Sequence, residues 1–247
     1  MSVATGRVAP GAASPTETQP NRSAAAGFWA RYAAWSLDAA LIAIPTSLLT
    51  AHKIAPAVDA CRSQFAAVLA RAARLFGEAL FAGQPLPEVA HALVHDPALR
   101  QGIAATEAAL VAIALPPLLV FALLAAVYHV CSEASAWQGS PGKRWLGLRV
   151  ADRAGRPLKL LQASARYFAG SASWATLNLG HLLAALPPQH RALHDRLAGT
   201  QVLTSRTGTL TTRAKAWLWL QALLALAASI WLGAAFAAMA QAALENI

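Results

Sequence analysis

Asp38 is the residue of this sequence whose type and position point most directly to chemistry. It stands in the run GFWARYAAWSLDAALIAIPTSLLTA, residues 27–51, which is long and apolar enough to cross a bilayer. A carboxylate at that depth costs about 2.5–3.5 kcal/mol on insertion scales, so it needs a partner, a proton, a cation or water. Asp38 could exchange a proton for a cation, or pair with a basic group that moves. The alternative is a structural aspartate bonded to a hydroxyl, to an arginine or, in its protonated form, to a backbone carbonyl.

Arg31 and Asp195 are two further charged residues with a candidate role. Arg31 shares a helix face with Asp38, but the two lie about 10 Å apart along the axis, too far for a direct bond. Arg31 could instead reach the lipid headgroups or pair with Asp195. Asp195 stands between His194 and Arg196, but no serine or cysteine nucleophile occupies a recognisable turn. We expect helix capping or an Arg31–Asp195 ion pair here, and we expect the protein not to be an enzyme.

Four other residues could handle protons or a metal. Glu107 and His129 lie near opposite ends of a second apolar run, where they could mark the two ends of a proton path, or simply be interfacial polar groups. His91 and His95 have the i, i+4 spacing that can ligate a metal, but no third ligand is evident. The sequence therefore predicts no metal site and no cofactor.

The composition is that of an integral membrane protein. The chain of 247 residues is 57% hydrophobic and only 13% charged, against roughly 25% charged residues in soluble proteins. The net charge of +9 arises from basic residues that lie between the apolar runs, where they set orientation and meet anionic headgroups. We therefore expect the lipid bilayer, not nucleic acid, as the partner. A transport path through so few spans would require a homo-oligomer.

Three apolar runs are the expected membrane-spanning helices, at residues 27–51, 103–131 and 215–244. Residues 1–26 are rich in Ala, Pro, Ser and Thr without periodicity, which predicts a disordered tail. Pro45 is expected to kink the first helix.

The connection at residues 52–102 is expected to be an extracytoplasmic amphipathic insertion. Apolar residues recur at helical spacing over 58–82, which predicts a helix that lies on the membrane surface or caps the bundle. The density of Lys and Arg is lowest in this connection, so the positive-inside rule places it outside and the N-terminus in the cytoplasm, within the cell (inner) membrane.

Short strands are expected at residues 145–150 and 200–204, with Gly199 ending a short helix before the second strand. Both basic loops around these strands favour the cytoplasmic side. Both loops can lie on that side only if the interrupted apolar stretch at 160–188 is a re-entrant or interfacial hairpin. A plain four-span bundle is the alternative. The predicted fold is an all-α membrane protein, a small bundle of three to four transmembrane helices with such a hairpin and a short cytoplasmic β-hairpin.

Three motifs in order resemble the RDD family of small prokaryotic membrane proteins, which is named for one arginine and two aspartates. They are Arg31 with Asp38, the run SPGKRWLGLRV and the run LHDRLAGT that contains Asp195. The resemblance implies that these three charged residues form a transport or structural charge network. It also implies an RDD-like membrane domain at 27–205, to which 206–247 adds a linker and a C-terminal transmembrane helix.

Two functions follow as expectations from this resemblance and from the buried carboxylate. Some members of the family are reported to be cation/proton antiporters, which implies transport of a proton or small cation through a path centred on Asp38. The alternative is a non-transporting structural or accessory membrane protein that binds a partner or lipid.

Overall fold

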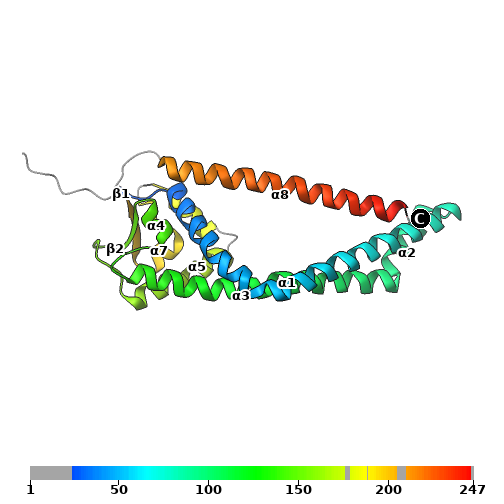
Figure 1. Cartoon of the computed structure of the whole chain (residues 1–247), viewed down its shortest axis with the longest axis horizontal. Coiled ribbons are helices and arrows are strands. Elements are labelled where there is room, and N and C mark those ends of the chain that lie inside the picture. Colours follow the sequence, from blue (N-terminus) through cyan, green and yellow to red (C-terminus); the bar gives the residue numbers. More distant parts are fainter. Residues whose placement is uncertain (1–23, 176–178, 188, 205–209, 246–247) are drawn as a thin grey trace, which may run out of the picture.

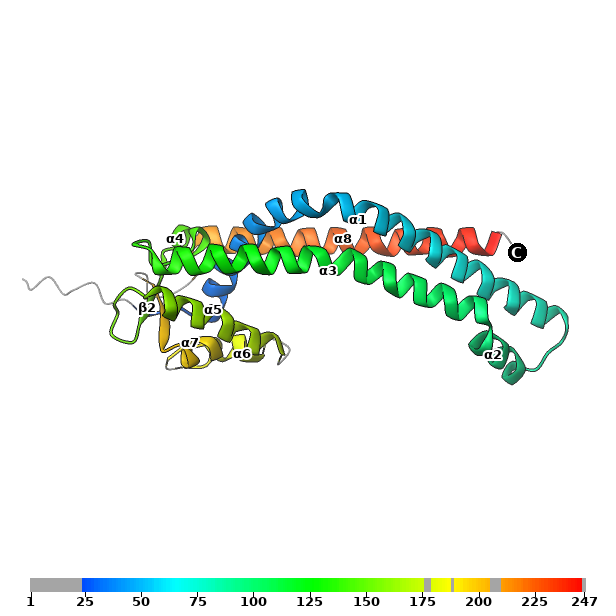
Figure 2. The same ribbon diagram turned by 90° about the horizontal axis from the view of Figure 1, so that it is seen from below.

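The computed structural model describes residues 24–175, 179–187, 189–204 and 210–245, and it has two regions (Figures 1 and 2). One region consists of long helices; the other, residues 135–204, is a small compact unit at one end of them, which we call the head. In chain order the elements are β1 (Ala24–Ala25), α1 (Phe28–Phe81), α2 (Leu86–His95), α3 (Pro97–Ala134), α4 (Pro141–Trp145), β2 (Leu148–Asp152), α5 (Leu160–Ala175), α6 (Leu179–Leu182), η1 (Leu183–Ala185), α7 (Leu193–Leu197), β3 (Thr200–Thr204) and α8 (Thr212–Glu245).

Three helices are long and apolar enough to cross a membrane: α1, α3 and α8. The most apolar window of α8 has no buried residues, and that of α3 is only 6% buried within the protein. An apolar helix surface left uncovered by protein is stable only against lipid. The predicted spanning runs are therefore found, although each helix extends beyond its predicted bounds.

Helix α1 is much longer than predicted. It runs without a break from Phe28 to Phe81 and contains Pro45 and Pro56. The helix predicted at 58–82 is therefore present but continuous with the first spanning helix, and its placement on the membrane surface or as a cap of the bundle stays a prediction. Each proline removes one backbone hydrogen bond, yet the helix continues through both positions. The helix changes direction near its middle (Figure 1) and packs along α3.

At the end of the molecule opposite the head, α2 joins α1 to α3 (Figure 2). We call residues 71–99 the far end. Asp96 caps α3 by accepting from the Leu99 backbone N–H at 2.8 Å, and it pairs with Arg71 of α1 at 2.7 Å. The sequence prediction that this end is extracytoplasmic stays a prediction.

A small antiparallel sheet pairs β1, which precedes α1, with the two strands of the head, in the order β1-β3-β2. Val150 of β2 is opposite Val202 of β3, but these strands do not form the predicted hairpin, because α5, α6, η1 and α7 intervene. The first strand also starts later than predicted: Trp145 belongs to α4, and Gly147, at φ +75°, separates that helix from β2. The second strand, and the end of α7 just before Gly199, are confirmed.

The predicted hairpin at 160–188 is a helix, α5, followed by the short elements α6 and η1; residues 176–178 and 188 lie outside the described part. With 16 residues, α5 is about 24 Å long at 1.5 Å per residue, shorter than the roughly 30 Å hydrocarbon core. This length favours a segment that does not cross completely, and the re-entrant or interfacial placement remains a prediction.

The hydrophobic core of the head brings the two regions together. It contains Ala33 and Ala34 of α1, strand residues such as Val150 and Val202, and Ala214 of α8. The last residues of the predicted 1–26 tail belong to this core unit: Ala24 and Ala25 form β1 against β3, and Ala26 is buried. The predicted tail is therefore too long by these residues, and residues 1–23 lie outside the described part.

Candidate functional site

Asp38 is completely buried at the junction of α1, α3 and α4. Its Oδ1 accepts hydrogen bonds from the Tyr128 hydroxyl at 2.7 Å and from the Gly142 backbone N–H at 2.7 Å, and its Oδ2 accepts one from the Ser140 hydroxyl. Helix α4 approaches so closely that a Cβ on Gly142 would lie 2.5 Å from the Ala34 carbonyl oxygen. Only glycine fits there, which explains the Ser-Pro-Gly run physically.

Lys143 connects this site to a second carboxylate. Its Nζ donates to Ser140 Oγ at 3.3 Å and to Glu133 Oε1 at 3.0 Å. Glu133, at the end of α3, also accepts from Arg166 Nε of α5 at 2.9 Å. All four side chains are buried, and the two cations satisfy the Glu133 carboxylate from both sides.

Asp195 is also completely buried, and it is held by two guanidinium groups. Arg31 Nη1 donates to Oδ2 and Arg166 Nη1 donates to Oδ1. Asp195 also caps α7 by accepting from the Ala192 backbone N–H at 3.0 Å. Burial by itself would raise the pKa of Asp195, but Arg166 and Arg31 hold that pKa below its ordinary value. The carboxylate therefore stays ionised.

Arg31 connects the start of α1 to the head. Besides its ion pair with Asp195, its Nε donates to the Ala26 carbonyl at 2.9 Å and its Nη2 to the His190 carbonyl at 2.6 Å. Its side chain is only 12% exposed. The Arg31–Asp195 pair, one of the two arrangements that the sequence left open, is the one present.

These residues form one continuous series, which we call the charge chain: Asp38, Ser140, Lys143, Glu133, Arg166, Asp195 and Arg31. Its ionisable members alternate in sign and cancel, with three acids and three bases. The charge chain connects α1, α3, α4, α5 and α7. Mutual pairing of this kind is what allows charges to remain buried in a small protein.

The sequence predictions identified three members of the charge chain and missed the rest. Glu133, Lys143 and Arg166 were not assigned a role. Arg166 carried a usable signal, because a charged residue within an apolar stretch needs a partner. Ser140 and Tyr128 had no such signal, since their importance depends on how close α3 and α4 come to Asp38.

Glu107 and His129 lie near opposite ends of α3, as the sequence predicts, and a proton path between them stays a prediction. Glu107 is exposed, on the half of α3 away from the head, and His129 lies about 33 Å farther along the helix at 1.5 Å per residue. Among the described residues, no group of three or more His, Cys, Asp and Glu side chains could hold a metal ion. His91 and His95 stack on each other, with ring centroids 4.0 Å apart.

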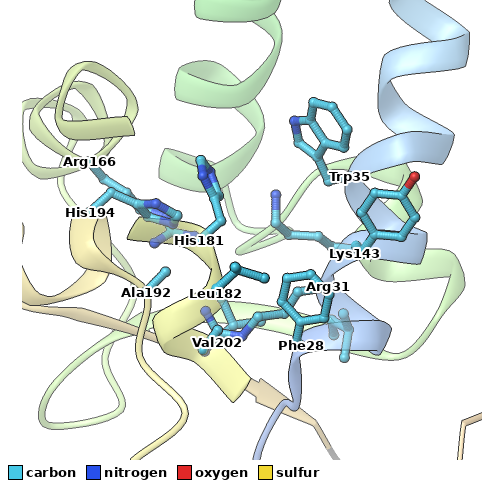
Figure 3. A pocket seen from close by; sticks show the side chains of 13 residues that line it. Phe28, Arg31, Trp35, Lys143, Arg166, His181, Leu182, Ala192, His194 and Val202 are labelled. Carbon is cyan, nitrogen blue, oxygen red and sulfur yellow. The ribbon is translucent and has the colours of Figure 1, made fainter. Parts of the chain in front are cut away.

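Two cavities flank the charge chain. The first, of ≈ 360 Å³, is shown in Figure 3, and the second is ≈ 610 Å³. Both are lined by Trp35, Lys143, Arg166, His181 and His194, and neither is lined by Asp38. The second also reaches along α3.

Three imidazoles near these cavities each have a buried ring nitrogen, Nδ1, that has no hydrogen-bond partner among the described residues: His129, His181 and His194. The rings of His181 and His194 have centroids 5.1 Å apart. Burial lowers the pKa of His194 to about 3, and Arg166 adds to that decrease. Burial, and then Arg166, also lower the pKa of His181. Both rings are therefore neutral at pH 7 and can exchange hydrogen bonds with a polar ligand.

Comparisons with known proteins agree with this architecture. Residues 25–199 match the model of the RDD family. Over 89 residues the chain is 32% identical to a protein of Bacillus subtilis (strain 168) named "Uncharacterized protein YxaI"; the match covers 36% of this chain and 58% of that relative. No solved structure matches. The family match covers α1, α3 and the head as far as Gly199, and it ends before β3 and α8.

Proposed function

The chain belongs to the RDD family of membrane proteins, and from this premise we propose that it is a non-transporting accessory membrane protein that binds lipid. The observation that carries this proposal is the state of Asp38. The carboxylate is 0% exposed, three donors occupy its oxygens, and it lines neither cavity. A carboxylate that exchanges a proton for a cation needs access for both, so this environment favours a structural role.

The charge chain supports the same proposal. Its members come from five helices, and its ion pairs connect the head to α1 and α3. Breaking one buried pair leaves an uncompensated charge and is strongly unfavourable. The charge chain would therefore hold the head rigidly at one end of the membrane helices, and it would perform no catalytic step.

Transport remains the second candidate, and one observation favours it. The cavity of ≈ 610 Å³ contacts His129, Glu133, Lys143 and Arg166 together. If the polar groups of this series exchanged hydrogen-bond partners, a proton could pass from one to the next without involving Asp38. In that case the path would run through Glu133 and His129, and Glu107 would be no part of it.

Ion-flux measurements on purified protein in liposomes would test the proposal. We expect cation-driven pH changes in the lumen to be the same for wild type, Asp38→Asn and protein-free liposomes. Asp152→Asn is the matched control, since that carboxylate belongs to an exposed turn with Arg156. A flux present in wild type and in the control but absent in folded Asp38→Asn would overturn the proposal. Loss in Glu133→Gln with retention in Asp38→Asn would establish the second candidate.

A further inference from the structure

The lining of the first cavity combines aromatic and basic side chains. Phe28, Tyr32 and Trp35 of α1 contribute aromatic rings. Of the basic side chains, Lys143 lies beside Trp35, Arg31 beside Phe28, and Arg166 near His194 (Figure 3). Their carboxylate partners, Glu133 and Asp195, do not line this cavity, and among the described residues no acidic side chain does. The lining thus suits a ligand that is largely apolar and has an anionic end.

Two imidazoles with an unpartnered Nδ1 among the described residues provide a second, independent indication of a ligand. Nδ1 of His181 and Nδ1 of His194 are buried without a partner among the described residues, and both rings line the cavity. A buried polar atom without a hydrogen-bond partner costs free energy, so a bound group that forms the missing hydrogen bond is favoured. A neutral imidazole nitrogen can accept from a hydroxyl or donate to an anionic oxygen, depending on the tautomer.

The position of the cavity along the helices indicates which kind of ligand has access to it. Exposed tryptophans mark this level: Trp29 at the start of α1 is 59% exposed and Trp219 near the start of α8 is 71% exposed. Tryptophan at helix ends is typical of the membrane–water interface. Three lining residues at the rim, Tyr32, Trp35 and Leu182, are also exposed. This placement would put the cavity at the depth of the phospholipid headgroups.

We propose that the first cavity binds the headgroup and upper acyl region of an anionic phospholipid. The phosphate would face Arg31, Lys143 and Arg166, hydroxyls of the headgroup would meet the two imidazoles, and the acyl chains would leave along the aromatic rings into the bilayer. A volume of ≈ 360 Å³ holds a headgroup and the top of its chains rather than a whole lipid. This inference specifies the lipid of the proposed function and rests on it.

The test uses the full chain in detergent micelles with dioctanoyl phosphatidylglycerol, dioctanoyl phosphatidylcholine and inorganic phosphate as probes, and measures affinity by microscale thermophoresis. We expect phosphatidylglycerol to bind wild type at least about tenfold more tightly than phosphatidylcholine, a difference of about 1.4 kcal/mol. Inorganic phosphate is expected not to compete, because it lacks the acyl chains.

Substitutions at the rim make the test specific to the cavity. Leu182→Glu places a carboxylate at an exposed lining position and is expected to weaken phosphatidylglycerol binding about tenfold. Leu182→Lys should bind at least as well as wild type, which excludes misfolding as the cause. Leu179→Glu is the matched control, because Leu179 lies on the same helix, is exposed and does not line the cavity.

Three outcomes would overturn the inference: equal affinity for the two lipids, equal weakening by Leu182→Glu and Leu179→Glu, or competition by inorganic phosphate, which would identify a free-anion site. Its failure is distinguishable from failure of the proposed function. Ion flux in liposomes would overturn the accessory role while leaving lipid selectivity intact, whereas absent selectivity without flux would overturn only the lipid site.

Discussion

Asp38 and Asp195 are equally buried, yet the protein stabilises them in different ways. Asp38 is surrounded by neutral donors, two hydroxyls and one backbone N–H, and the nearest cation in its series, Lys143, reaches it only through Ser140. Asp195 is paired directly with two arginines. The Asp38 site therefore keeps α4 packed closely against α1, whereas the Asp195 site neutralises charged side chains that come from distant parts of the sequence. The predictions below test this difference.

Asp195→Asn should have the largest effect. It leaves Arg31 and Arg166 without their shared anion in a buried site, so the free energy of unfolding should fall by about 3–5 kcal/mol. Chemical unfolding in detergent micelles, followed by circular dichroism, would measure this. Asp59→Asn, at an exposed position of α1, should change little. Equal losses in the two variants would mean that the buried charge chain does not stabilise the head.

Asp38→Asn should have a smaller effect, because the amide keeps one oxygen acceptor and leaves no cation unpaired. We expect a loss of about 1.5–3 kcal/mol, the usual value of hydrogen bonds to a charged group. The same unfolding experiment applies. If this variant were less stable than Asp195→Asn, the comparison between the two carboxylates would be reversed.

Gly142→Ala tests the close approach of α4 to α1 without changing any charge. The new Cβ would meet the Ala34 carbonyl oxygen at 2.5 Å and Asp38 Oδ1 at 2.7 Å, and we expect a loss of about 1–3 kcal/mol from overpacking. Gly233→Ala in α8 is the control, since a Cβ there meets nothing within 4 Å. An unchanged unfolding curve for Gly142→Ala would show that the contact can relax.

The pH dependence of stability should report the buried imidazoles beside Asp195. The folded protein keeps His194 neutral down to a pKa of about 3, whereas the unfolded chain takes up a proton near 6.5. The unfolded state therefore binds more protons in this window, and stability should fall as the pH decreases from 6.5 to 5. His194→Gln should show a shallower decrease than wild type between these pH values. Identical slopes would contradict a neutral, buried His194.

The prediction from sequence was good for helices and poor for their ends. The apolar runs that predict spanning helices are present in α1, α3 and α8. The expected break after residue 51 was wrong because a proline removes only one helix bond, and packing along α3 outweighs that loss. The predicted β-hairpin failed for another reason: strand pairing across several intervening helices leaves no local signal.

The sequence alone determined which residues would be difficult to bury. Arg31 and Asp38 were recognisable because a charge in or near an apolar segment requires compensation, and that requirement depends on residue type and local context. Asp195 was recognisable through the family motif. The resemblance to the RDD family grouped the three residues, and the family match confirms that membership.

Only the tertiary structure decided which partners compensate these charges. Arg31 meets Asp195 across 164 positions of the chain, and Asp38 meets Ser140 across 102. Contacts of this kind depend on the packing of α1 against α3, α4 and α7, to which residues throughout the molecule contribute. Hydrophobic periodicity acts over a few helical turns, so it predicts the helices and leaves open how their charged side chains are paired.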